Sequence, residues 1–239
     1  MPYTPSPPPF DAVAAYGIGG LAVFMAGAVG WVWRRHAPRS APAAIGVLGA
    51  WMIGTASLAA SGALARFDRV PPPMPLFILS VFVLAFGVGL STAGATLARA
   101  VPLSTLIGLQ AFRLPLELVM HRAGTLGIMP PELSYGGYNF DVLTGAGALA
   151  LWLLGRAGVA VPRAAVWTWN VWGLWCLAVI TAIAITTSPM VRAFGDDPRH
   201  VNTWVLYFPY VWLPAVLVLI ALAGHLVIAR ALLAGRPAA

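Results

Sequence analysis

The chain has 239 residues, of which 60% are hydrophobic and 9% are charged, and its formal net charge is +7. Soluble domains contain about 25% charged residues, so this composition is typical of a protein embedded in a lipid bilayer. The 14 basic residues are all arginines that punctuate apolar runs without forming a patch, so we expect no nucleic-acid partner. Because lysine is absent, the chain cannot hold retinal or pyridoxal phosphate as a Schiff base. The single cysteine, Cys176, excludes an internal disulfide.

The first ten residues, MPYTPSPPPF, are rich in proline and contain no basic group. This pattern predicts an extended tail over residues 1–10 and differs from the basic start of a cleaved signal peptide. We expect residues 11–230 to form one transmembrane domain and residues 231–239 to form a short cytoplasmic tail.

Seven apolar runs follow the tail, each bounded by arginine or proline. They cover residues 11–33, 43–65, 75–98, 101–121, 140–156, 164–188 and 204–229. A helix needs about 20 mostly apolar residues to cross a bilayer, so the runs predict an all-α, polytopic transmembrane bundle of seven helices. The fourth run is the most polar and the fifth is the shortest. No internal repeat is visible, which argues against a secondary transporter built from two duplicated halves.

The arginines between the runs predict the orientation of the chain. With the N-terminus outside and the C-terminus cytoplasmic, eight arginines fall on the cytoplasmic side and five fall outside. The cytoplasmic set is Arg34, Arg35, Arg39, Arg99, Arg156, Arg163, Arg230 and Arg236. The bias towards Ala, Arg, Pro and Gly is typical of a GC-rich bacterial genome, so we expect a multi-pass protein of the bacterial cytoplasmic (inner) membrane.

The fourth run contains an unusual polar stripe in the segment LQAFRLPLELVMHRAG, residues 109–124. At about 100° per residue, Gln110, Arg113, Glu117 and His121 fall within one 80° sector of a helix. A lipid-facing charge costs several kcal/mol, so we expect the stripe to face the interior of the bundle. The one-turn spacing of Arg113 and Glu117 predicts an ion pair, and Pro115 between them predicts a kink.

Two interpretations of the stripe remain open at this point. An intramembrane Arg–Glu pair is able to fasten helices together without any other role. Ionisable groups inside a membrane are nevertheless functional candidates by default, and His121 adds a side chain that titrates near neutral pH. We therefore treat Glu117 and His121 as candidate catalytic or proton-handling groups, and Arg113 as a candidate anchor for an anion.

The segment SYGGYNFDVLTG, residues 134–145, opens the fifth run on the same side of the membrane as the outer end of the stripe. Capping of the fifth helix is the favoured interpretation for Asp141 alone. The loop after the second run also lies on this side. The expected ligand-binding set, arranged around an outward-facing polar site, is Gln110, Arg113, Glu117, His121, Asn139, Asp141, Arg66 and Asp68.

The histidines are not expected to share a depth in the membrane. Counting about 1.5 Å per residue, His121 falls near the outer surface. The seventh run starts near Trp204, which places His225 about 30 Å further inward, near the cytoplasmic face. We therefore expect no metal or haem site and no bound cofactor, and we expect His225 to hydrogen-bond Asn170 on the inner side.

The most distinctive segments of the chain are FRLPLELVMH in the fourth run and NFDVLTG at the start of the fifth. They are accompanied by WN at 169–170 and SP at 188–189. In this combination the chain resembles a family of uncharacterised bacterial seven-helix integral membrane proteins with FRxPLExxxH and NFDxxTG segments. The resemblance covers residues 60–225, and it implies that both segments belong to one recurring site. It implies no activity.

Three classes of function fit these features. The first, which we favour, is the binding or translocation of a small polar or anionic molecule, or of protons, at an outward-facing intramembrane site. The second is a membrane-embedded enzyme, with or without a metal, that uses Glu117 or His121. The third is a non-catalytic partner subunit or sensor. No nucleophile stands beside a base in the sequence, so an enzyme ranks below binding. The expected partners are the lipid bilayer and a small polar or anionic ligand, and the sequence identifies no protein partner.

Overall fold

The computed structural model describes residues 5–235, and all the regular secondary structure in that range is helical. The nine α-helices of this range are α1 (Ala12–His36), α2 (Ala41–Ala60), α3 (Pro73–Leu90), α4 (Thr92–Ala100), α5 (Leu103–Leu109), α6 (Arg113–Thr125), α7 (Val142–Arg156), α8 (Arg163–Thr186) and α9 (Leu219–Leu233). Short 3-10 turns lie between them, including η1 (Ala63–Ala65), η2 (Gln110–Phe112), η3 (Pro131–Leu133) and η4 (Pro198–His200). A π-helical segment, η6 (Leu213–Val218), leads directly into α9.

Six helices within residues 5–235 are long and apolar enough to cross a membrane. They are α1, α2, α3, the combined α5–α6 unit (Leu103–Thr125), α8, and the combined η6–α9 unit (Leu213–Leu233). The fifth expected run forms the shorter apolar helix α7, which has 15 residues. The expected all-helical membrane fold is therefore confirmed, and its helices of spanning length number six in the described range.

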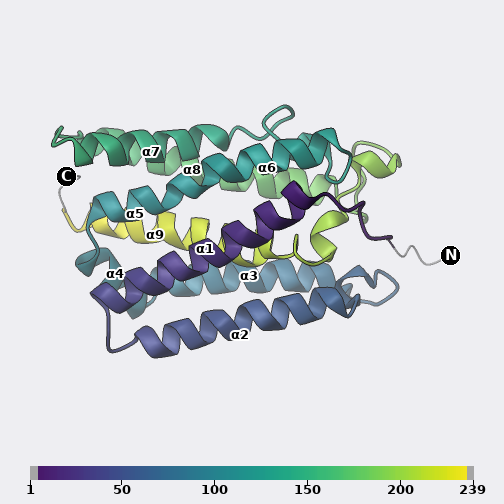
Figure 1. Cartoon of the computed structure of the whole chain (residues 1–239), viewed down its shortest axis with the longest axis horizontal. Coiled ribbons are helices and arrows are strands. Elements are labelled where there is room, and N and C mark those ends of the chain that lie inside the picture. The colour runs from purple at the N-terminus through teal and green to yellow at the C-terminus, as the bar shows by residue number, and fades with distance from the viewer. Residues whose placement is uncertain (1–4, 236–239) are drawn as a thin grey trace.

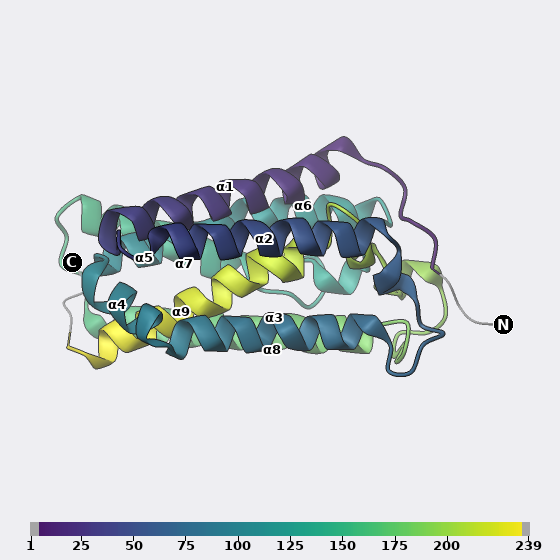
Figure 2. The same ribbon diagram turned by 90° about the horizontal axis from the view of Figure 1, so that it is seen from below.

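The helices form an elongated antiparallel bundle (Figure 1). Helices α1 and α2 lie along one side, and α7 and α8 lie along the other, with α9 running obliquely through the middle (Figures 1 and 2). Residues 5–10 of the N-terminal tail and the loops 61–72, 126–141 and 187–212 gather at one end of the bundle, which we call the mixed-charge end. The loops 37–40 and 157–162, helix α4 and the end of α9 gather at the opposite end, which we call the basic end.

The third expected run divides at Ser91. Helix α3 ends at Leu90, and the Ser91 hydroxyl then caps α4 by accepting a hydrogen bond from Gly94 N at 3.2 Å. The Arg230 guanidinium donates to the carbonyls of Gly89 (2.8 Å) and Ser91 (2.7 Å), and the Ser91 carbonyl also accepts from Ala95 N at 3.0 Å. Helix α4 thus folds across the basic end of the bundle, beside α9.

The fourth expected run is interrupted at the position of its polar stripe. Helix α5 ends at Leu109, the turn η2 covers Gln110–Phe112, and α6 starts at Arg113. Pro115 has no N–H to bond the carbonyl of Ala111, so the regular helical ladder cannot pass this turn. The expected irregularity is therefore present, one turn before Pro115.

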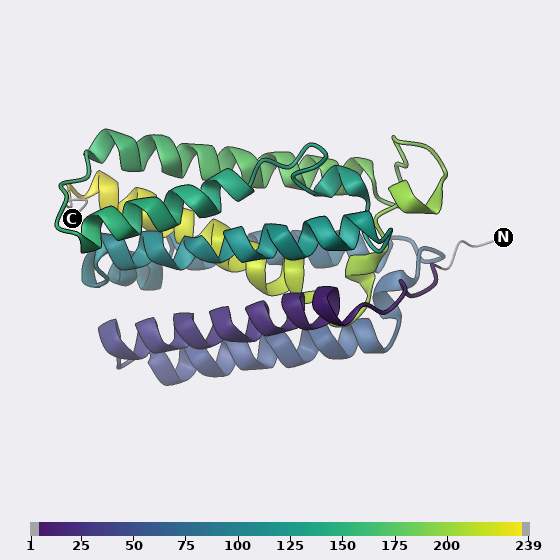
Figure 3. The ribbon, with the colours of Figure 1, turned by 45° about the horizontal axis from the view of Figure 1, so that its top comes forward.

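Residues 126–141 form an irregular segment that packs inside the bundle (Figure 3). Its buried residues include Met129, Leu133, Asn139 and Asp141. Irregular backbone is tolerated at membrane depth only where protein or a cavity surrounds it, because lipid offers no hydrogen bonds. This segment fills the half of the bundle that the short helix α7 leaves free, and it carries two of the expected site residues.

Candidate functional site

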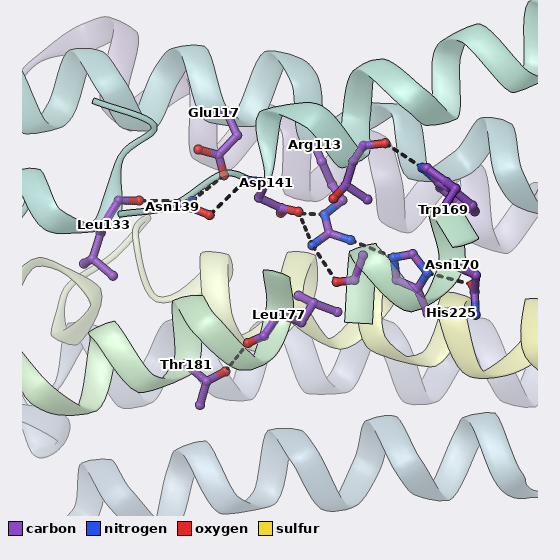
Figure 4. Close-up of polar contacts among 12 residues, drawn as sticks. Arg113, Glu117, Leu133, Asn139, Asp141, Trp169, Asn170, Leu177, Thr181 and His225 are labelled. Atoms are coloured by element: carbon purple, nitrogen blue, oxygen red, sulfur yellow. Dashed lines mark hydrogen bonds and ion pairs between the residues drawn. The ribbon is translucent and has the colours of Figure 1, made fainter. Parts of the chain in front are cut away.

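Arg113 lies at the centre of a buried polar network that joins four helices (Figure 4). Its Nε donates to Asp141 Oδ2 at 2.6 Å, and its Nη2 forms an ion pair with Asp141 Oδ1. Nη1 contacts His225 Nε2 at 2.7 Å, and Nη2 also donates to the carbonyl of Gly173 at 3.4 Å. Arg113 is 1% exposed, so its guanidinium is shielded from the membrane lipid. Arg113 is thus a buried cation held by one carboxylate, one imidazole and one carbonyl.

The contact with Arg113 determines the tautomer of His225. An arginine side chain has donors only, so His225 Nε2 must accept the hydrogen bond with its lone pair. His225 Nδ1 therefore carries the proton and donates to Asn170 Oδ1 at 2.8 Å. The Trp169 ring packs on the imidazole, with ring centroids 5.3 Å apart, and Trp169 Nε1 donates to the carbonyl of Thr144 at 2.9 Å. Between these partners His225 is a neutral acceptor for Arg113.

Glu117 lies one turn beyond Arg113 on α6 but bonds to a neutral group. Its Oε1 accepts from Asn139 Nδ2 at 2.8 Å, and Asn139 Nδ2 also donates to the carbonyl of Leu133 at 3.1 Å. Asn139 Oδ1 accepts from the backbone N–H of Asp141 at 3.1 Å. Glu117 is 1% exposed, and its Oε2 has no hydrogen-bond partner within the described part of the chain. Asn139 therefore connects the Glu117 carboxyl to the Arg113–Asp141 pair.

A small cavity of about 30 Å³ adjoins this network. Arg113, Glu117 and Asp141 form its polar wall, and apolar side chains of η2, α6, α8, η6 and α9 form the remainder. A water molecule needs at least about 10–15 Å³ of such volume, so the cavity has room for about two waters. A larger organic ligand does not fit without movement of the helices.

Two glycines allow the helices to approach the network closely. A Cβ at Gly145 on α7 would overlap the backbone of Arg113 and Leu114, and a Cβ at Gly173 on α8 would overlap the imidazole of His225. Both glycines are therefore close-packed positions of the site that the sequence interpretation missed. The signal for Gly145 is its place in the NFDVLTG segment, four residues after Asp141.

The structure brings together five of the eight expected ligand-binding residues. Gln110, Arg113, Glu117, Asn139 and Asp141 are all buried around the break between α5 and α6. The Gln110 amide lies against Gly224 of α9, where a Cβ would overlap it, and its Oε1 has no partner among the described residues.

The other three expected residues lie elsewhere. His121 is partly exposed, two turns beyond Arg113 on α6, and its ring stacks on Tyr135 with centroids 4.2 Å apart. Arg66 and Asp68 form an exposed ion pair at 3.0 Å with each other, in the loop between α2 and α3. That loop has no part in the buried network.

Three expectations about partners are wrong. Arg113 pairs with Asp141 and not with Glu117, and the Asp141 side chain makes no capping hydrogen bond to α7. His225 also lies beside the stripe and not near the cytoplasmic face. The depth count failed because residues 201–212 form turns and the last helical unit begins at Leu213, which places His225 about 18 Å along it. The expected Asn170–His225 hydrogen bond is confirmed.

The buried network contains few metal-ligating groups in one place. Within residues 5–235 no three His, Cys, Asp or Glu side chains gather as a set able to hold a metal ion. The Nε2 lone pair of His225 is engaged by Arg113, and both Asp141 oxygens face the same guanidinium.

Comparison of the chain with protein-family models, with curated proteins and with solved structures gave no match. A functional proposal is therefore based on the structure itself. It is that of an all-helical, multi-pass membrane protein with a charged network in its interior.

Proposed function

We propose that this protein binds protons at Glu117, inside a seven-helix bundle of the bacterial cytoplasmic membrane, with the N-terminus outside and the C-terminus in the cytoplasm. The observation that carries the proposal is the environment of Glu117. This carboxyl is buried beside a water-sized cavity, accepts a hydrogen bond from a neutral amide, and keeps Oε2 free. A proton on Oε2 would remove a charge from the membrane interior without breaking the bond to Asn139.

The geometry supports protons over a small organic anion as the ligand. Arg113 was the expected anion anchor, but Asp141, His225 and Gly173 occupy its guanidinium. The adjoining cavity of about 30 Å³ admits water and excludes larger molecules. Water and protons are therefore the species that the site accommodates as it stands.

The same network indicates that protons reach Glu117 from only one end of the bundle. The fixed charge of Arg113 repels a proton on its way to His225, as arginines do in other proton-excluding pores. His121 is the nearest titratable side chain on α6 towards the mixed-charge end, one turn beyond Glu117 and partly exposed. We infer that protons reach Glu117 from the mixed-charge end and that Arg113 stops them there.

The test is a pH titration of the purified protein followed by infrared difference spectroscopy. We expect a protonated-carboxyl band that titrates in the wild type and is lost in Glu117→Gln, which keeps an oxygen for the Asn139 bond. Glu132→Gln is the matched control, because Glu132 is also buried but belongs to the surface turn η3 and bonds His200. An unchanged titrating band in Glu117→Gln overturns the proposal.

A second measurement separates proton binding from simple helix fastening. In the fastening interpretation, Glu117→Gln lowers the unfolding temperature and no titrating buried carboxyl exists in the wild type.

Reconstituted liposomes loaded with a pH-sensitive dye test whether protons reach Glu117 from one side only. We expect no proton leak in the wild type and a measurable leak in Arg113→Gln if that variant remains folded.

A further inference from the structure

A second hollow lies on the opposite side of the bundle from the polar network, between α2 and α3. It has a volume of about 400 Å³ and is lined by Ala50, Gly54 and Leu58 of α2, Leu64 of η1, and Leu76 and Phe77 of α3, among others. The two helices lie apart here, and α9 is visible between them (Figure 2). The volume is within the range of ligand pockets, about 300–1,000 Å³.

The walls of this α2–α3 groove are chemically apolar. Its two hydroxyls are satisfied internally, since Thr55 donates to the Met52 carbonyl at 3.1 Å and Ser80 donates to the Phe77 carbonyl at 2.6 Å. The Trp51 ring stacks on Phe77, and its Nε1 donates to the Ala215 carbonyl at 2.7 Å. The hydroxyl and indole protons are thus all donated to protein carbonyls, and the remaining lining is apolar, so the groove favours an apolar occupant.

The mouth of the groove, in contrast, lies beside a loop with charged side chains. Leu58, Leu64 and Pro73 line its end at the loop 61–72, which lies at the mixed-charge end. In this loop both oxygens of Asp68 accept hydrogen bonds from Arg66, at 3.0 Å each. Arg69 is exposed and forms no hydrogen bond or ion pair within the described residues. The loop therefore presents one cation that is not bonded to a carboxylate, and the same loop contributes Leu64 to the groove and leads into Pro73 at its end.

We propose that the α2–α3 groove binds an acyl chain of an anionic phospholipid, with the lipid phosphate held by Arg69. The groove extends from Leu58 to Ala50, about 12 Å along α2, so it follows the direction of a lipid chain from the membrane surface. An empty hollow of this size would forfeit dispersion contacts along its whole lining, which a chain from the surrounding bilayer restores. The cation at the mouth selects a negatively charged headgroup.

Glycine substitutions on α2 test the groove itself. The built Cβ positions of both Gly54 and Gly46 have no atom within 4 Å, so a side chain can start at either position without overlap. Gly54 lines the groove and Gly46 does not. We expect protein purified from membranes in mild detergent to retain phosphatidylglycerol, measured by native mass spectrometry. Gly54→Leu should lose most of this lipid, and Gly46→Leu, the matched control, should retain it.

The headgroup part of the proposal has its own test. An arginine near an anionic membrane surface contributes about 1 kcal/mol, so Arg69→Gln should lower the preference for phosphatidylglycerol over phosphatidylcholine about fivefold. Arg199→Gln is the control, since Arg199 lies at the same end in another loop. Arg69→Gln alters an exposed residue, so loss of folding does not obscure the result.

Three outcomes overturn the proposal. The first is equal retention of phosphatidylglycerol by the wild type and Gly54→Leu. The second is a preference for phosphatidylglycerol that Arg69→Gln leaves unchanged. The third is a change in oligomeric mass in Gly54→Leu without loss of lipid, which would show that a second copy of the chain covers the groove.

Discussion

Arg113 and Asp141 are two charges that the membrane interior tolerates because they face each other. Their side chains are 1% and 7% exposed, and each would be strongly destabilising without the other. Asp141→Asn leaves a buried arginine without a compensating charge, so we expect the free energy of unfolding to fall by about 3–5 kcal/mol. Thermal unfolding in mild detergent measures this change. Asp68→Asn, in the exposed Arg66–Asp68 pair, is the control and should unfold as the wild type does.

Asp11 makes stability depend on pH at the mixed-charge end. It caps α1 by accepting from Ala14 N at 2.9 Å, and it also accepts from Arg122 at the end of α6 at 2.8 Å. The hydrogen bond from Arg122, followed by the one from Ala14, lowers the pKa of Asp11 from 3.8 to about 2. Because the folded-state pKa is depressed, this stabilisation is complete above about pH 4 and is lost as the pH falls towards 2.

We therefore expect Asp11→Asn to unfold at a lower temperature than the wild type at pH 7 and to show a weaker dependence on pH between about 4 and 2. Asparagine retains the capping function, so the difference reports the pair with Arg122. Asp197→Asn is the control. Its partner, Arg199, is two residues away, so their contact persists in the unfolded chain and contributes less to stability. Identical acid unfolding of Asp11→Asn and the wild type would contradict the prediction.

The sequence predicted which side chains are buried better than it predicted their partners. Helix geometry alone placed Gln110, Arg113 and Glu117 on one inward face, and each is 1% exposed. The predicted partner of Arg113 was wrong because Asp141 belongs to an irregular segment. The path of such a segment cannot be read from the spacing of apolar residues. Neutral Asn139 occupies the position beside Glu117 that Arg113 was expected to hold.

At the scale of elements, the bundle is organised around breaks in its helices. The turn η2, the segment 126–141 and the π-helical η6 all lie against the buried network or its cavity. In the sequence, Pro115 predicted the irregularity at η2. The sequence analysis placed residues 204–212 in the last run, but the structure has turns there, and this is why His225 was placed at the wrong depth.

Gly145 tests how tightly α7 must pack on the break between α5 and α6. Its Cβ would overlap the backbone of Arg113 and Leu114, which cannot rotate away as a side chain does. We expect Gly145→Ala to cost about 1–3 kcal/mol of unfolding free energy, because overpacking forces the backbone to shift. Gly87→Ala on α3 meets no atom within 4 Å and should be neutral or slightly stabilising, since alanine favours helix. A Gly145→Ala variant as stable as the wild type would show that the two helices can separate freely.

The π-helical segment η6 lies between the two hollows of the molecule. Leu213 and Leu217 line the water-sized cavity, and the carbonyl of Ala215 accepts the hydrogen bond from Trp51 at the floor of the α2–α3 groove. Trp212 Nε1 donates back to the carbonyl of Met52 at 3.1 Å. A lipid in the groove would therefore pack against the element that also encloses the network around Glu117.

At the scale of the whole molecule, the charges are segregated along the bundle. Apart from the buried Asp141, the mixed-charge end, with Asp11 and Arg122 counted there, contains five carboxylates and five arginines, and most of them form ion pairs. The basic end has no acid among the described residues, and its arginines are Arg34, Arg35, Arg39, Arg99, Arg156, Arg163 and Arg230. Cytoplasmic loops of membrane proteins carry an excess of Arg and Lys, so this asymmetry supports the proposed orientation with the basic end in the cytoplasm.

The orientation is tested by labelling single cysteines from outside the cell. Cys176 is buried, and replacing it with alanine provides a cysteine-free background. Ser61 lies at the mixed-charge end and Ser40 at the basic end, and both are exposed at helix boundaries. We expect a membrane-impermeant maleimide to label Ser61→Cys but not Ser40→Cys in intact cells, and to label both after permeabilisation. The reverse pattern would place Arg69 and its proposed lipid in the cytoplasmic leaflet and would bring protons to Glu117 from the cytoplasm.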